Sequence, residues 1–179
     1  MVTLNSERLQ TLAARKPIVV HTSQAASELA TEEQLIWVKN LVRCIHAAEW
    51  YVIESAKSGM ASYVEVLIGP PSNAIAFRKC VYGPFAAIGA GSYTLFRPGE
   101  LRAWTPLSLE TVDAYDSSLS AVAQAISVQL HDDGVRLLSR QELSASVADS
   151  IAAQIHSSLP ALEGRHGGLV YDVLFQWDD

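Results

Sequence analysis

Cysteine, long apolar runs and low-complexity stretches are scarce or absent in this chain of 179 residues, and each absence excludes a class of protein. Only two cysteines occur, Cys44 and Cys80, and neither has the CxxC or CxxH spacing of a zinc or redox site. We expect both to be buried thiols in a reducing compartment, with a disulfide between them as the alternative. No run approaches the roughly 18 apolar residues that a membrane helix needs.

The amino-terminal segment also lacks the pattern of an export signal. Glu7 and Arg8 stand where a signal peptide would have its apolar centre, so we expect the protein in the cytoplasm. Apolar residues make up 49% of the chain and charged residues 18%, which supplies a core and excludes disorder as the dominant state. This length predicts one domain over residues 1–179, with a division near residue 100 as the main alternative.

Negative charge is concentrated in the second half of the chain. Residues 1–99 hold 9 Lys/Arg and 7 Asp/Glu, a net charge of +2, whereas residues 100–179 hold 4 and 12, a net charge of −8. An acidic surface repels a polyanion, so nucleic acid is not an expected partner. A basic protein partner fits this charge, although acidic surfaces also keep many cytoplasmic proteins soluble.

Recognisable catalytic and cofactor motifs are missing as well. The glycines of "GPFAAIGAGSYTLFRPG" run on into a strand pattern, not into the helix of a phosphate loop, and indicate a bulge or close packing against a large side chain. The five histidines form no helical metal pair, and neither GxSxG nor SxxK occurs. We therefore predict no cofactor, no metal and no catalytic residue. Carboxylates for acid/base chemistry could lie among Glu49, Glu54 and Glu65, where solvent-facing strand positions are the commoner role.

Apolar residues at helical spacing predict three long helices and a shorter one at the amino terminus. The expected ranges are 5–15, 31–48, 108–131 and 140–159. Thr31 with Gln34, and Ser139 with Glu142, have the form of capping boxes that begin the second and fourth of these helices.

From about residue 49 to 97 the apolar period changes to two, which is typical of strands. Four segments rich in β-branched and aromatic residues are separated by short turns that contain Gly or Pro: "EWYVIES", "SYVEVLIG", "AIAFRKCVY" and "AAIGAGSYTLF". Connections this short favour antiparallel neighbours, so we predict a four-stranded meander.

The chain ends in alternating apolar residues followed by two aspartates, in "LVYDVLFQWDD". Tyr171, Val173, Phe175 and Trp177 share one parity, which predicts a carboxy-terminal strand over about 169–177. This strand would pair with the segment near 135–138 or with an edge of the meander. The predicted fold class is thus α+β, with an antiparallel sheet and helices packed on one face.

Six residues are candidates for binding a partner. Trp104 lies in the short segment "LRAWTP" near Arg97 and Arg102, and Trp and Arg dominate interface energies. The alternative role for Trp104 is to close the core between sheet and helix. The acidic candidates are Glu110, Asp113, Asp116, Asp178 and Asp179.

A small, acidic α+β chain without a catalytic constellation resembles, in size and charge, the immunity proteins that bacteria make against their own secreted toxins. The resemblance implies a non-catalytic inhibitor that occludes the active cleft of a basic toxin with its acidic face and associates fast. One alternative is a secretion chaperone, which predicts a stable dimer with a hydrophobic groove. The other is a small enzyme or ligand-binding domain, which predicts a concave pocket with convergent polar groups.

Overall fold

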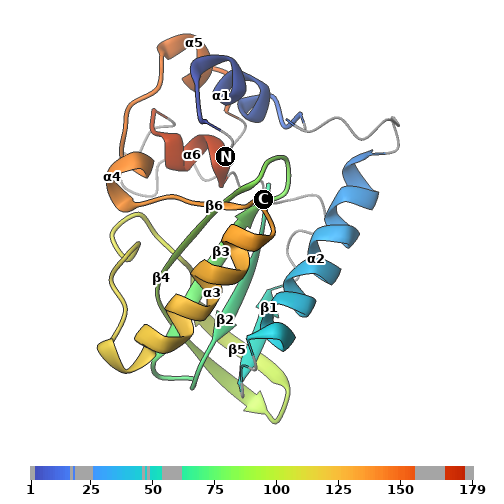
Figure 1. Ribbon diagram of the computed structural model, residues 1–179, viewed down its shortest axis with the longest axis vertical. Coiled ribbons are helices and arrows are strands. Elements are labelled where there is room, and N and C mark those ends of the chain that lie inside the picture. The colour runs from blue at the N-terminus through green and yellow to red at the C-terminus, as the bar shows by residue number, and fades with distance from the viewer. Residues whose placement is uncertain are drawn as a thin grey trace.

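An antiparallel-dominated sheet stands at the centre of the computed structural model, which describes residues 3–16, 18, 26–45, 47, 49–53, 62–155 and 168–175 (Figure 1). Five strands follow one another in chain order as a meander. They are β1 (Trp50–Ile53), β2 (Tyr63–Ile68), β3 (Ala74–Cys80), β4 (Phe85–Arg97) and β5 (Glu100–Thr105). A short sixth strand, β6 (Arg136–Leu137), pairs in parallel with the start of β4.

The predicted α+β class and the meander are confirmed, and the meander is one strand longer than expected. Gly99 adopts a φ of +81°, which L side chains rarely take, and this lets the chain reverse after Arg97 and return as β5. Trp104 therefore lies in a strand and not in an irregular segment.

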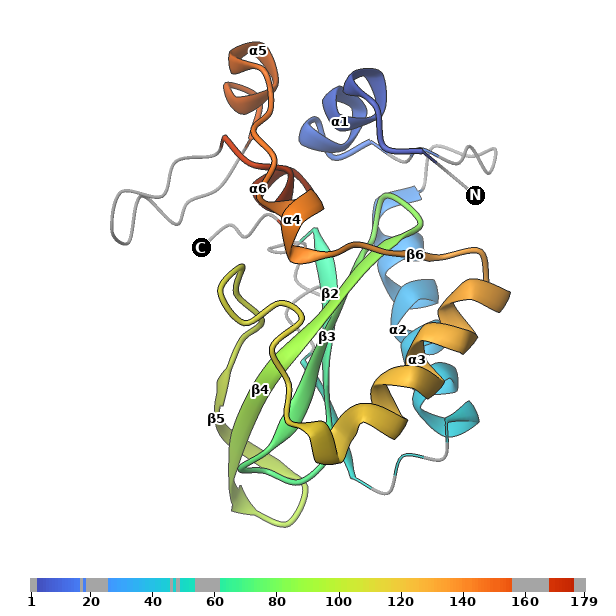
Figure 2. The same ribbon diagram turned by 60° about the vertical axis from the view of Figure 1, so that its left-hand side comes forward.

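Helices and connecting segments bury both faces of the sheet, not the one face expected. On one face, side chains such as Val66 and Phe77 pack against α2 (Ala26–Cys44) and α3 (Ser120–Asp132), which lie side by side in Figure 1. The opposite face carries Leu67 and Phe85. It packs against short helices that gather at one end of the sheet in Figure 2. These are α1 (Ser6–Ala13), α4 (Arg140–Leu143), α5 (Asp149–Ala152) and α6 (Val170–Leu174).

Helix α2 begins at Ala26, five residues before the predicted start. Thr31 and Gln34 thus lie within the helix and not at its start, so the helix start predicted at Thr31 was wrong. The predicted capping box at Ser139 and Glu142 is confirmed: each side chain accepts a hydrogen bond from the other residue's backbone N–H, at the start of α4. The expected helix over 140–159 is nevertheless broken into the single turns α4 and α5, and its last residues, 156–159, lie outside the described residues.

The helix predicted over 108–131 was wrong in its first half. A 3-10 turn (Ser117–Leu119) leads into α3, and residues 108–116 are turns and irregular backbone in which Val112 bridges to Gly89 of β4. Asp113 has a φ of +62°, outside the helical region, and its N–H donates to the Ile88 carbonyl on β4. The Ala90 N–H donates in turn to the Thr111 carbonyl, so the sheet satisfies backbone groups that a helix would have paired internally.

The predicted carboxy-terminal strand was also wrong, because this segment forms α6. Val170, Val173 and Leu174 are buried at helical spacing. The Asp172 carboxylate accepts a hydrogen bond from the Leu169 N–H and so stabilises the first turn. Phe175 is buried too, so the expected burial of this end holds for the described residues, whereas Trp177 lies outside them.

Candidate functional site

A groove of about 700 Å³ follows the outer edge of β1. All four β1 residues line it, together with Lys39 of α2 and with Leu101 and Trp104 of β5. Successive residues of a strand point to opposite faces, so a groove that touches four in a row lies along the strand's edge. β1 and β5 are the first and last strands of the meander, and the groove lies between them.

A bulge in β5 brings Leu101 and Trp104 to the same groove. Thr94 of β4 is opposite Ala103, but the next residue, Leu95, is opposite Leu101, which leaves Arg102 as an extra residue. Leu101 and Trp104 are three residues apart and would point to opposite faces of a regular strand. The extra residue changes the parity, as bulges beside binding sites often do.

Tyr51 of β1 joins the two walls of the groove. Its hydroxyl donates to the Gly99 carbonyl at 2.7 Å and accepts from the Leu101 N–H at 2.9 Å. Its ring also lies against that of Tyr93 on β4, with 6.2 Å between the centroids. The strongly curved sheet thus brings its two ends together through a side chain.

Exposed apolar side chains gather beside this groove. Of the five large ones exposed among the described residues, Leu95, Phe96 and Trp104 belong to the β4–β5 hairpin, with exposed fractions of 39%, 61% and 39%. The Arg97 guanidinium lies over the Phe96 ring, 5.3 Å from its centroid. We call Leu95, Phe96, Arg97 and Trp104 the hairpin surface. Trp104 was expected either at an interface or closing the core, and it lies at the edge of the groove.

The acidic candidates lie elsewhere. Glu110, Asp113 and Asp116 are exposed on the segment between β5 and α3. Val112 in this segment pairs with Gly89 of β4. Gly89 comes four residues before Tyr93, the β4 residue that is opposite Trp104. The acidic residues are therefore not brought into the groove. Asp178 and Asp179 lie outside the described residues.

Two of these carboxylates have local structural roles. Asp113 Oδ2 accepts a hydrogen bond from the Arg140 N–H at 2.8 Å, at the first turn of α4. Asp116 Oδ1 accepts from the Ser118 N–H at 2.8 Å and caps the 3-10 turn. Hydrogen bonds from Ser118 hold the pKa of the Asp116 carboxyl below its ordinary value.

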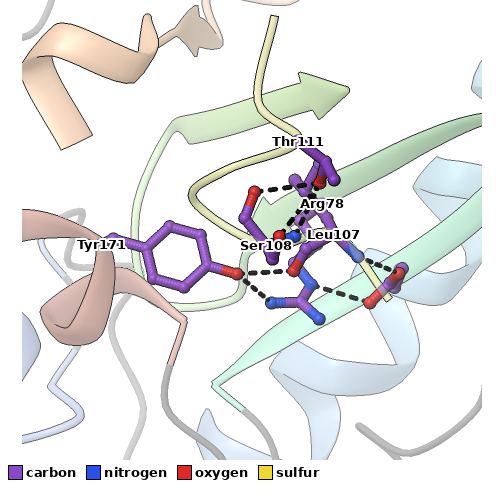
Figure 3. A network of polar contacts seen from close by, with 6 residues as sticks. Arg78, Leu107, Ser108, Thr111 and Tyr171 are labelled. Carbon is purple, nitrogen blue, oxygen red and sulfur yellow. Dashed lines mark hydrogen bonds and ion pairs between the residues drawn. The ribbon is translucent and has the colours of Figure 1, made fainter. Parts of the chain in front are cut away.

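A second polar cluster lies inside the fold (Figure 3). Arg78 of β3 and Glu65 of β2 are directly opposite, with 2.7 Å between Nε and Oε2, and their side chains are 6% and 1% exposed. Arg78 Nη1 donates to the Tyr171 hydroxyl at 2.7 Å, and this hydroxyl donates to the Leu107 carbonyl at 2.6 Å. Glu65 Oε1 accepts from the Leu107 N–H at 3.0 Å. The cluster joins β2, β3, α6 and the segment after β5.

The surroundings of this cluster favour the charged form of Arg78 and the neutral forms of the two tyrosines. Burial disfavours the Arg78 cation, but the Glu65 carboxylate outweighs this effect and raises the pKa of Arg78. Burial also raises the pKa of Tyr171, and it raises the pKa of Tyr63 to about 12. The centroid of the Tyr63 ring lies 4.1 Å from the central carbon of the Arg78 guanidinium. The cluster therefore holds a buried ion pair. The expected solvent-facing position of Glu65 was wrong.

On the opposite face of the sheet, Lys79 is buried next to α2. Its ammonium donates to the Cys80 carbonyl at 3.1 Å and lies 5.4 Å from the centroid of the Trp37 ring. Burial lowers the pKa of Lys79 to about 8. Cys80 is a buried free thiol as expected, whereas Cys44 is free but exposed, so the alternative of a disulfide was wrong.

Neither a metal-binding cluster nor a membrane-spanning helix occurs among the described residues. In the part of the chain that the structure describes, no three His, Cys, Asp or Glu residues are grouped so that they could bind a metal ion. None of its helices has the length and apolar character needed to cross a membrane. The chain matches no protein-family model, and it matches none of the curated proteins or solved structures with which it was compared.

Proposed function

We propose that this protein is a non-catalytic protein-binding protein, and that the hairpin surface with the adjoining groove is its contact surface. One observation carries the proposal: three of the five exposed large apolar side chains of the described residues lie on one hairpin, at the edge of the groove. Clustered exposed apolar side chains are typical of interaction sites, and Trp with Arg supplies much of the binding energy at interfaces.

A protein partner suits this surface better than a small ligand does. Phe96 and Leu95 are exposed but do not line the groove, so a ligand held within the groove would leave them in water. A partner surface could cover both the groove and the hairpin. A small ligand is the second candidate, because about 700 Å³ falls within the usual range of ligand sites.

Within this class, we propose the role of a bacterial immunity-type inhibitor in the cytoplasm, which neutralises a toxin by occluding its active cleft. The charge distribution supports a basic partner. Residues 103–135 contain no Lys or Arg, and their acidic residues are all exposed. These are Glu110, Asp113, Asp116, Asp132 and Asp133. Together with Asp178 and Asp179, they would attract a basic toxin and speed its association.

The experiment that tests protein binding is an affinity capture from the native host with matched variants. Trp104→Ser and Phe96→Ser remove exposed apolar contacts from the hairpin surface. Val128→Ser, on α3 and 51% exposed, removes one from a helix that contributes no residue to the groove. We expect the wild type and Val128→Ser to retain one stoichiometric partner that both hairpin variants lose. Equal retention by all four proteins would contradict the proposal.

The inhibitor role requires a second measurement, on the captured partner. Its enzymatic or toxic activity should fall to zero at one equivalent of the protein. Glu110→Lys should slow association and leave dissociation nearly unchanged, because exposed charges act mainly on the encounter. Full partner activity in the saturated complex would contradict inhibition without affecting the proposal of protein binding. A dimeric free protein would favour the secretion chaperone instead.

A further inference from the structure

We propose that the groove receives an extended segment of the partner, which pairs with the outer edge of β1 as an added strand. This inference rests on the proposed protein-binding function and specifies how the partner binds. Four observations support it: the backbone phase of β1, the position of the groove, the link made by Tyr51 and the chemistry of the lining.

The backbone phase of β1 leaves hydrogen-bonding groups at the groove. The Gly69 N–H donates to the Glu49 carbonyl at 2.9 Å, which makes these two residues a hydrogen-bonded pair of the antiparallel ladder. Such pairs alternate along a ladder, so Tyr51 and Ile53 direct their N–H and C=O groups towards β2. The N–H and C=O groups of Trp50 and Val52 point the other way, towards the groove that these residues line.

Tyr51 lines the groove and contacts the β4–β5 turn. The hydroxyl of Tyr51 accepts a hydrogen bond from the Leu101 N–H and donates one to the Gly99 carbonyl. Further along β5, Trp104 forms the wall opposite β1. The first and last strands of the meander thus face each other across an open space. An added strand there would pair with β1 and be covered by Trp104. Strand addition at an exposed sheet edge is a recurrent mode of peptide recognition.

The lining predicts the sequence of the incoming segment. Trp50 and Val52 belong to the face that packs on α2, the helix that carries Lys39, whereas Tyr51 and Ile53 belong to the opposite face. Among the described residues of the lining, Lys39 is the charged one. Side chains of an added strand alternate between the two faces. We therefore infer a segment that alternates apolar residues, set against Leu101 and Trp104, with acidic residues set towards Lys39.

The test uses ten-residue peptides selected from a random display library on the immobilised full-length protein. Each backbone amide of a selected peptide is then methylated in turn and the affinity measured. Methylation removes one N–H donor and keeps the side chains. If the peptide adds as a strand, methylation at every second position should weaken binding about tenfold, and the intervening positions should tolerate it. The selected sequences should alternate apolar and acidic residues.

A variant of the protein supplies the second readout. Val52→Pro removes an outward N–H that the β1–β2 ladder does not use, and proline is tolerated at such edge positions. It should abolish peptide binding, whereas Ile36→Ser, on the exposed face of α2, should leave it unchanged. An unchanged thermal midpoint would show that Val52→Pro is folded. If Val52→Pro unfolds, the methylation pattern of the peptide alone tests strand addition.

Three results would overturn strand addition. The first is a methylation profile without alternation, and the second is a selection that yields no binding peptide. The third is a wild-type dimer that Val52→Pro dissociates, because a second copy of the protein would then occupy the edge of β1. None of these would by itself refute protein binding, which depends on the loss of the captured partner in Trp104→Ser. Retention of the partner by Trp104→Ser would refute both proposals.

Discussion

The hydroxyl of Tyr51 on β1 donates a hydrogen bond to the carbonyl oxygen of Gly99, in the turn between β4 and β5, with 2.7 Å between the two oxygens. The two residues are 48 positions apart in the chain, at opposite ends of the meander. The same hydroxyl accepts from the Leu101 N–H, so one side chain holds the β4–β5 hairpin beside the first strand. The groove and the hairpin surface depend on this contact for their relative position.

Tyr51→Phe should release the hairpin from β1 without unfolding the sheet. Two hydrogen bonds are lost, and since the site is partly exposed we expect a cost of about 1–2 kcal/mol in the free energy of unfolding. Hydrogen exchange of the Leu101 amide should become faster. The Asp113 amide, which donates to Ile88 on a distant part of β4, is the internal control and should keep its protection. Unchanged exchange at Leu101 would show that the contact does not form in solution.

Arg78→Met should destabilise the protein by about 3–5 kcal/mol, because it leaves the Glu65 carboxylate buried without its cation. The double variant Glu65→Met/Arg78→Met should recover most of this loss, since it leaves no unpaired charge in the core. Urea unfolding of the two single variants, the double variant and the wild type measures the coupling. If the double variant loses as much stability as the two single variants together, the ion pair is not buried as it is in the structure.

Lys79 makes the stability depend on pH in the alkaline range. Burial lowers its pKa from 10.5 to about 8, so between these values the unfolded chain binds more protons than the folded one. Stability should therefore rise with pH through this window, and the buried cation should cost on the order of 3 kcal/mol below it. Lys79→Met should be more stable than the wild type at pH 7, with a smaller advantage at pH 10. A difference that does not vary with pH would contradict the burial of this ammonium.

Gly89→Ala should displace the segment that follows β5 and bridges to β4 through Val112. An added Cβ would lie 2.1 Å from the Thr111 carbonyl oxygen and 2.8 Å from Leu107 Cδ1, both closer than real Cβ contacts. We expect a loss of about 3 kcal/mol and faster exchange of the Ala90 amide, which donates to that carbonyl. Wild-type stability would show that the segment can move aside at no cost.

Local patterns in the sequence predicted the elements that local interactions determine. The period of two and the Gly/Pro turns located the strands from Trp50 to Arg97, and Ser139 with Glu142 marked the start of α4. The glycines of β4 pack closely as expected: a Cβ at Gly91 would lie 2.8 Å from that of Ala76.

Contacts between distant parts of the chain determined the rest. Leu109, Val112 and Tyr115 fit a helical stripe equally well in sequence. Val112 is instead buried by a turn whose backbone bonds to β4, and no local pattern contains that strand. Six of the seven residues from 169 to 175 are apolar, so the pattern suits a strand or a helix. The hydrogen bond from the Leu169 N–H to the Asp172 carboxylate is a feature of the helix, not of a strand.

The candidate site was predictable in one residue only. Trp104 was singled out for its residue type, and it lines the groove. The groove itself depends on the curvature that brings residues 50–53 beside residues 101–104, and sequence spacing does not encode this curvature. Asp113 and Asp116 were chosen for their charge, but their hydrogen bonds to Arg140 and Ser118 are visible only in the structure.

The most direct test of protein binding through the hairpin surface is the affinity of the captured partner for the wild type, Trp104→Ser and Val128→Ser, measured by calorimetry with the folded state of each verified. We predict that Trp104→Ser weakens binding by at least about thirtyfold, a hot-spot loss of about 2 kcal/mol, and that Val128→Ser changes it less than about threefold. Equal affinities for all three proteins would contradict the proposal and place the contact surface elsewhere on the molecule.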